Sequence, residues 1–311
     1  MANTTKTSVA NSLPDTFIAE VRLKTQEGPI MRALVNNVTL PTGEGGQWEM
    51  TELTRATAVA LADGFDMVGT DTITDSTLQI TPTEFGAQLT ITDLAKNQIT
   101  KRTDLIRQAG RILGNSMTTK EDIDLLTMLD GFSVALGSAT TTMTPGHIMA
   151  AASAVRGGGQ AAGAIVAGTP EPAPDPIYGV FNDYMLHGVT KFLAGGTVGV
   201  SGTAIAGTGV SAPSGGAGAE ALAEARVGRI GRATVYSDNN LSKDSADDAK
   251  GGVFSKEAIV QVHFMGGPTM EEQRDASLRG TEYNIVMVKG TGEFKDAWGR
   301  EMLFDAASPT S

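Results

Sequence analysis

The sequence has no cysteine, few aromatic residues and no long hydrophobic run. Without cysteine, its 311 residues form no disulfide, no thiolate metal site and no thiol nucleophile. No stretch of about 18 consecutive apolar residues is available to span a membrane. The first 14 residues are polar and lack the apolar centre of a signal peptide. We therefore expect a fold without covalent cross-links and without a membrane partner.

Basic residues are also scarce. The chain carries 24 Lys and Arg against 35 Asp and Glu, a formal net charge of −11. Tight nucleic-acid binding needs clusters of Lys and Arg, so this balance argues against direct recognition of DNA or RNA. Hydrophobic residues make up 41% of the chain, enough for a sizeable core in one large or two moderate domains.

Motifs of catalysis are missing as well. The three histidines, His147, His187 and His263, are far apart and lack metal-ligand spacing. The glycine-rich stretches match neither a phosphate-binding loop nor a dinucleotide fingerprint, and no Gly-x-Ser-x-Gly elbow occurs. The acidic run Asp63 to Asp75 lacks the order of a calcium-binding loop and is typical of a solvated loop tip. We expect no catalytic residue, metal or cofactor, and therefore no enzyme.

One long helix dominates what is present. From Thr103 to Leu129 apolar residues recur at three- and four-residue spacing, with Thr103 as the predicted N-cap and Gly131 as the stop. At 1.5 Å per residue such a helix is roughly 40 Å long. The remaining elements are expected to be arranged around it.

The segment before this helix is predicted to be an extended excursion. Residues 47–51, 56–61 and 89–92 have strand-like composition and flank the acidic run 63–75. A segment this long with so few apolar side chains to bury is expected to pack against a partner outside its own domain.

A mixed α/β region is predicted after the helix. The patterns favour helices over 147–155 and 183–193, strands over 177–181, 228–236 and 258–263, a polar surface turn over 238–250, and an uncharged glycine-rich loop over 195–219. Thr269 and Glu272 have the spacing of a capping box and predict a short helix over 269–275. A strand over 281–289 is then expected to end in a turn at Gly290–Gly292, after which residues 298–304 run back as the second strand of a strand–turn–strand unit.

The order of these elements resembles the major capsid proteins of tailed bacteriophages, the Hong Kong 97 type. The closing segments carry the resemblance best: Gly252-Val-Phe-Ser-Lys-Glu-Ala258, Arg279-Gly-Thr-Glu-Tyr283 and Trp298-Gly-Arg-Glu-Met302. The resemblance implies an α+β fold with an N-terminal arm over 1–34, an extended two-stranded loop over 35–92, a peripheral domain with its spine helix over 93–145, an axial domain over 146–266, and a return to the peripheral domain over 267–311.

The function implied by the resemblance is a structural one. Hexamers and pentamers of the chain would close into an icosahedral virion shell around double-stranded DNA, assembled in the cytoplasm of the host bacterium. The implied partners are other copies of the chain, a portal protein, possible decoration proteins and DNA held without sequence-specific contact. Because only about thirty residues precede Val35, a separately encoded scaffolding protein is expected. Two alternatives stay open: an encapsulin-like nanocompartment shell, and an α/β hydrolase.

Charged residues on the spine helix are candidate assembly contacts. Basic residues gather at its start and acidic ones towards its end, the reverse of what the helix dipole favours. Either salt screens the cost, or the two ends meet oppositely charged neighbours. Together with two residues of the excursion, the candidates are Trp48, Glu49, Arg102, Arg107, Arg111, Glu121, Asp122 and Asp124.

Overall fold

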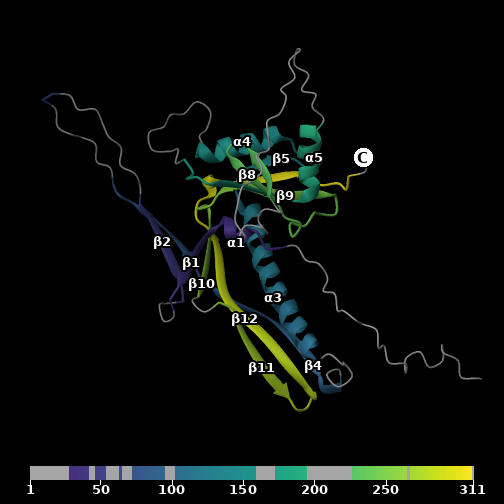
Figure 1. The fold of residues 1–311 in the computed structure, drawn as a ribbon. Helices are drawn as coiled ribbons and strands as arrows, with labels where there is room; N and C mark the ends of the chain where they lie inside the picture. Colours follow the sequence, from purple (N-terminus) through teal and green to yellow (C-terminus); the bar gives the residue numbers. More distant parts are fainter. Residues whose placement is uncertain are drawn as a thin grey trace, which may run out of the picture.

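The computed structural model describes residues 28–41, 46–53, 63–64, 72–94, 102–158, 172–194, 226–264 and 267–309. Two sheets and one long helix, α3, organise these residues (Figure 1). The predicted loop 195–219, residues 65–71 of the acidic run and most of the N-terminal arm lie outside the described residues. Among the described helices, none is long and apolar enough to cross a membrane.

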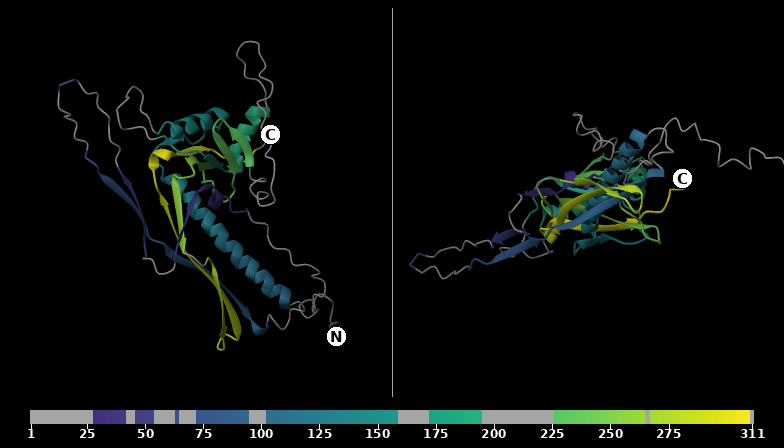
Figure 2. Two further views of the ribbon diagram at one scale, coloured as in Figure 1. Left: turned by 60° about the vertical axis from the view of Figure 1, so that its left-hand side comes forward. Right: turned by 90° about the horizontal axis from the view of Figure 1, so that it is seen from below.

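Helix α3 runs from Arg102 to Thr127 and continues as the 3₁₀ turn η2, Met128–Gly131, which confirms the predicted long helix. Its buried side carries Ala109, Leu113 and Met117 along its middle and Leu125 and Leu126 near its end. Figure 2 shows α3 running from the six-stranded sheet along the five-stranded one. One helix thus contributes to two hydrophobic clusters.

The five-stranded sheet is built around β12, Gly280–Glu293. Along one side β12 pairs antiparallel with β4, Thr83–Thr92. On its other side it pairs with β11, Thr269–Asp275, and further along with β10, Ile259–Phe264. The strand β1, Asn36–Leu40, joins β10 in parallel. Alternate residues of β4 and β12 then face α3, and Ile91, Tyr283 and Ile285 are buried against it.

Two predictions fail in this sheet. Residues 269–275 form β11 rather than a helix, because they pair over seven residues with β12 and their sequence has no apolar stripe to bury. Gly290 and Gly292 do not turn the chain, because β12 continues through them. Ile80 packs on these glycines instead: a Cβ at either position would lie 2.7 Å from an Ile80 side-chain carbon.

The predicted excursion is anchored at both ends. Its first and last strands, β1 and β4, belong to the five-stranded sheet. Between them β2, Trp48–Leu53, and β3, Asp75–Ile80, form a separate antiparallel pair, which we call the β2–β3 ribbon. Ile80 and Trp48 hold its foot against Leu40 and the β10 residue Val260. The rest of the ribbon extends away from the body (Figure 1).

The six-stranded sheet has the order β5-β13-β9-β6-β8-β7. In Figure 1 the helices α4, Pro145–Arg156, and α5, Asp183–Ala194, lie above it, and the upper end of α3 lies below it. These helices and the strand β6 lie where the sequence predicted them. The six strands are Ala135–Gly137 (β5), Gly299–Asp305 (β13), Asp248–Ser255 (β9), Ile177–Phe181 (β6), Ala233–Ser237 (β8) and Arg226–Ile230 (β7).

Three details of this sheet differ from expectation. The predicted strand 228–236 is a hairpin of β7 and β8, because Gly231 adopts φ +60° and reverses the chain. The predicted surface turn 238–250 includes the start of β9, and both Asp238 and Asp248 are buried. Sheet membership also crosses the expected domain limits, because β13 lies in the six-stranded sheet and β10 in the five-stranded one.

Candidate functional site

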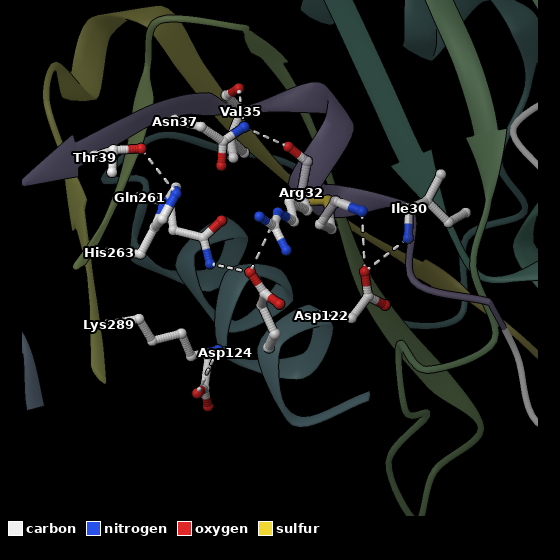
Figure 3. A network of polar contacts seen from close by, with 12 residues as sticks. Ile30, Arg32, Val35, Asn37, Thr39, Asp122, Asp124, Gln261, His263 and Lys289 are labelled. Atoms are coloured by element: carbon white, nitrogen blue, oxygen red, sulfur yellow. Dashed lines mark hydrogen bonds and ion pairs between the residues drawn. The ribbon is translucent and has the colours of Figure 1, made fainter. Parts of the chain in front are cut away.

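The acidic end of α3 faces inward and organises a polar network (Figure 3). Asp122 is only 1% exposed. Its Oδ1 accepts hydrogen bonds from the backbone N–H groups of Ile30 and Met31, each at 2.9 Å, and its Oδ2 accepts one from Asn240 Nδ2 at 2.9 Å. Ile30 precedes the short helix α1, Met31–Leu34, so Asp122 satisfies N–H groups that a helix start leaves unpaired.

Glu121, the residue before Asp122, contacts a different pair of segments. Its carboxylate accepts a hydrogen bond from Gln261 Nε2 on β10 at 2.7 Å and lies 3.7 Å from Arg32 Nε of α1. Both Glu121 and Gln261 are buried. One carboxylate therefore joins α3 to the segment that begins β1 and to the strand with which β1 pairs.

The β1–β10 pair carries a histidine beside this carboxylate. Thr39 Oγ1 and His263 Nε2 lie 3.0 Å apart. Burial lowers the pKa of His263, the positive charge of Arg32 lowers it further, and Glu121 acts in the opposite direction. The imidazole is thus favoured in its neutral form, in which it is able to share one hydrogen bond with the threonine.

Asp124 lies two residues after Asp122 on α3 and contacts two lysines. Lys120, four residues earlier on α3, pairs with it, and Lys289 of β12 places Nζ 3.3 Å from its Oδ2. The Lys289 side chain is only 4% exposed, and its Nζ lies 4.7 Å from the centre of the Phe85 ring. Burial lowers the pKa of Lys289, while Asp124 opposes that shift.

These contacts change the interpretation of the charged spine. Glu121 and Asp122 have their partners inside their own chain and have almost no surface left for a neighbour. The prediction that they meet another subunit is therefore corrected: they hold the N-terminal segment and β10 to α3. Their position near the helix C-terminus opposes the dipole, but hydrogen bonds from backbone and side-chain donors compensate.

The other candidates lie elsewhere. Arg111 is exposed on α3, whereas the side chains of Arg102 and Arg107 lie outside the described residues. Trp48 and Glu49 are on the β2–β3 ribbon, where Trp48 is partly buried and Glu49 accepts a hydrogen bond from Gln79 Nε2 at 2.7 Å. The described candidates thus lie at three places: the polar network at the acidic end of α3, the exposed Arg111, and the β2–β3 ribbon. Sequence reasoning missed Asn240, Gln261 and Lys289, although Gln261 and Lys289 are conspicuous as polar residues within apolar strands.

The described residues contain no group of three or more His, Asp or Glu side chains able to hold a metal ion. Two of the histidines have structural neighbours instead: His147 contacts Thr144 at the start of α4, and His263 contacts Thr39. The described part of the chain therefore presents a network suited to joining segments of a fold.

We compared the sequence and the fold with those of known proteins. No family model matches the chain, and no curated protein matches its sequence. Solved structures do match over nearly the whole length. The capsid of Ralstonia phage GP4 is 13% identical with a TM-score of 0.67, and 96% of each chain is covered. The capsid of Helicobacter pylori bacteriophage KHP30 is 11% identical with a TM-score of 0.66, covering 99% of this chain and 100% of that one.

The chain has the Hong Kong 97-type fold of tailed-phage capsid proteins. The predicted fold class is thereby confirmed. An encapsulin also matches, the SrpI protein of Synechococcus elongatus PCC 7942, at 11% identity and a TM-score of 0.56, with 100% of this chain and 98% of that chain covered. The likeness to the two phage capsids is greater.

Within this capsid fold, Asp122 is expected to be a main source of stability. Asp122→Ala leaves the N–H groups of Ile30 and Met31 and the amide of Asn240 without their acceptor. We expect a loss of about 2–4 kcal/mol in the free energy of unfolding, measured by urea denaturation of unassembled protein. Asp130→Ala is the control: among the described residues, exposed Asp130 pairs with exposed Lys250 alone, so the substitution should cost less than about 1 kcal/mol. Equal losses in both variants would contradict this role.

A second carboxyl pair predicts a pH dependence. Burial raises the pKa of Glu293 to about 7, helped by the nearby charge of Asp296, while Asp296 accepts a hydrogen bond from the Ser133 N–H at 2.7 Å. Between pH 4.5, the ordinary pKa, and about 7 the folded state binds more protons than the unfolded state, so stability falls as the pH rises through that window.

Glu293→Gln should remove that loss. After allowance for its partial exposure, we expect the variant to gain about 1–2 kcal/mol over wild type at pH 8 and nothing at pH 4. Urea denaturation at both pH values measures the difference, with Glu84→Gln on the exposed side of β4 as control. A gain of the same size at both pH values would rule out titration of Glu293 as the cause.

Proposed function

We propose that the protein is a major capsid protein, which assembles as hexamers and pentamers into an icosahedral shell around double-stranded DNA. The observation that carries this proposal is the match over nearly the whole chain to structures of phage capsids. The expected site is the virion, with assembly in the host cytoplasm. A separate scaffolding protein, a portal protein and decoration proteins belong to the same proposal, as do the arm, loop, peripheral and axial divisions of the chain.

Two physical features support a container. The net charge of −11 disfavours tight binding of the shell to DNA, and so favours packaging and release. Leu53 at the end of β2 and Ile73 just before β3 have apolar side chains that are 65% and 76% exposed. A two-stranded ribbon is marginally stable alone, so a neighbouring subunit that covers it would stabilise both.

The exposed Arg111 is retained as a proposed contact between subunits. Among the described residues its side chain is exposed, and an acidic neighbour would form a salt-sensitive pair with it. Arg102 and Arg107 belong to the same proposal.

The alternatives predict different particles. An encapsulin-like shell would contain protein cargo and no DNA, whereas a hydrolase would remain a monomer or small oligomer. Analysis of purified particles for DNA and for cargo protein distinguishes a phage capsid from an encapsulin-like shell. Size-exclusion chromatography distinguishes a shell from a monomeric or small oligomeric hydrolase. The fold comparison favours the phage capsid, because its TM-scores exceed that of the encapsulin.

The β2–β3 ribbon provides the direct test. Negative-stain microscopy of the protein, expressed together with its scaffolding protein, should show closed shells. Replacing residues 54–74 by Asn-Gly keeps the paired strands and the packed foot of the ribbon, so the protein should stay folded but form no closed shells. The control exchanges residues 54–74 for a Gly/Ser segment of equal length, which should restore part of the assembly if reach alone matters. Normal shells from the shortened variant would refute residues 54–74, which connect the two strands of the ribbon, as an inter-subunit contact.

A further inference from the structure

A polar cleft of about 260 Å³ lies at the foot of the β2–β3 ribbon. Its walls come from three places: the chain that leads from the ribbon into β4 together with the start of β4, the C-terminal part of α3, and β12. The residues that matter here are Thr81, Thr83, Phe85, Lys120, Asp124 and Lys289.

The cleft is positive in a chain that is strongly negative. Two lysines and one aspartate give it a formal charge of +1, against −11 for the whole sequence. Lys120 reaches solvent with 56% of its side chain exposed, whereas Lys289 is 4% exposed. One ammonium therefore lies at the mouth of the cleft and one within its wall.

Lys289 is incompletely satisfied. Its Nζ makes an ion pair with Asp124 at 3.3 Å, but among the described residues no acceptor meets it in hydrogen-bond geometry. An ammonium has three N–H donors, and burying one without acceptors is costly. An acceptor with two oxygens in the cleft would reduce this cost, and the Thr81 and Thr83 hydroxyls on the same wall are able to donate to it.

We propose that this cleft binds the carboxylate of an acidic side chain from a second copy of the chain. The inference rests on the proposed function as a shell. A neighbouring copy has the same excess of acidic over basic residues, 35 against 24 in the whole sequence, so close packing of copies requires local sites of positive charge. Lys289 and Lys120 provide such a site where the ribbon leaves the body.

The test compares lysine variants in assembly. Lys289→Met keeps a long apolar side chain beside Phe85 and leaves Asp124 paired with Lys120, so the unassembled protein should melt at or above the wild-type temperature. The protein concentration needed for shell formation, followed by light scattering, should rise about tenfold or more because a charge-assisted contact is lost. Lys120→Met should cause a smaller rise. Lys191→Met, which removes an exposed lysine of α5, should cause none.

An anion competition provides the second measurement. At constant ionic strength, acetate or phosphate in place of chloride should raise the concentration needed for wild-type assembly and have no such effect on Lys289→Met. Assembly of Lys289→Met at the wild-type concentration would overturn the proposal, and so would equal effects of acetate and chloride on wild type.

The same measurements distinguish two further outcomes. If acetate or phosphate raises the melting temperature of unassembled wild type while Lys289→Met assembles normally, the cleft binds free anions only and the second copy is excluded as its source. If wild type forms no shells even with a scaffolding protein present, the proposed function fails, and with it the second copy as the occupant of the cleft.

Discussion

The fold depends on one buried carboxylate, that of Asp122. It lies near the end of α3 yet accepts its hydrogen bonds from Ile30, Met31 and Asn240. These contacts fix the point at which the N-terminal segment enters the core, where Met31 and Leu34 are buried. Because β1 follows directly and pairs with β10, the same carboxylate determines where the chain of the β2–β3 ribbon begins.

Helix α3 links the two sheets because its two halves have different neighbours. Ala109, Leu113 and Met117 are buried against β4 and β12 of the five-stranded sheet. Leu125 and Leu126, with Leu129 of η2, belong to the core of the six-stranded sheet. Glu121, Asp122 and Asp124 lie between these two apolar groups. A rigid helix with apolar contacts at each end and polar contacts between them holds both sheets in one relative orientation.

Local patterns in the sequence were sufficient for some elements. The long helix, α4, α5 and β6 have periodic apolar positions and were predicted close to their observed limits. Thr269–Asp275 was predicted wrongly because capping-box spacing is a local signal, whereas its state is determined by pairing with β12. The order of elements, more than any single motif, carried the resemblance to capsid proteins, and the fold comparison agrees with it.

The candidate site was less predictable. Glu121 and Asp122 are charged, and nothing near them in sequence indicates burial. Their partners Gln261 and Met31 are 140 and 91 residues away, so only the tertiary fold brings donors to these carboxylates. Lys289 was missed for the same reason, because its contacts come from α3 and β4.

Hydrogen exchange tests the central claim most directly: the acidic end of α3 is internal architecture, and the β2–β3 ribbon is where copies meet. Exchange is compared between unassembled protein and assembled shells. The account predicts that the amides of Ile30 and Met31 are protected in both, whereas amides of Trp48–Leu53 and Asp75–Ile80 gain strong protection only in shells. Rapid exchange at Ile30 and Met31 before assembly, with a ribbon already fully protected, would contradict it.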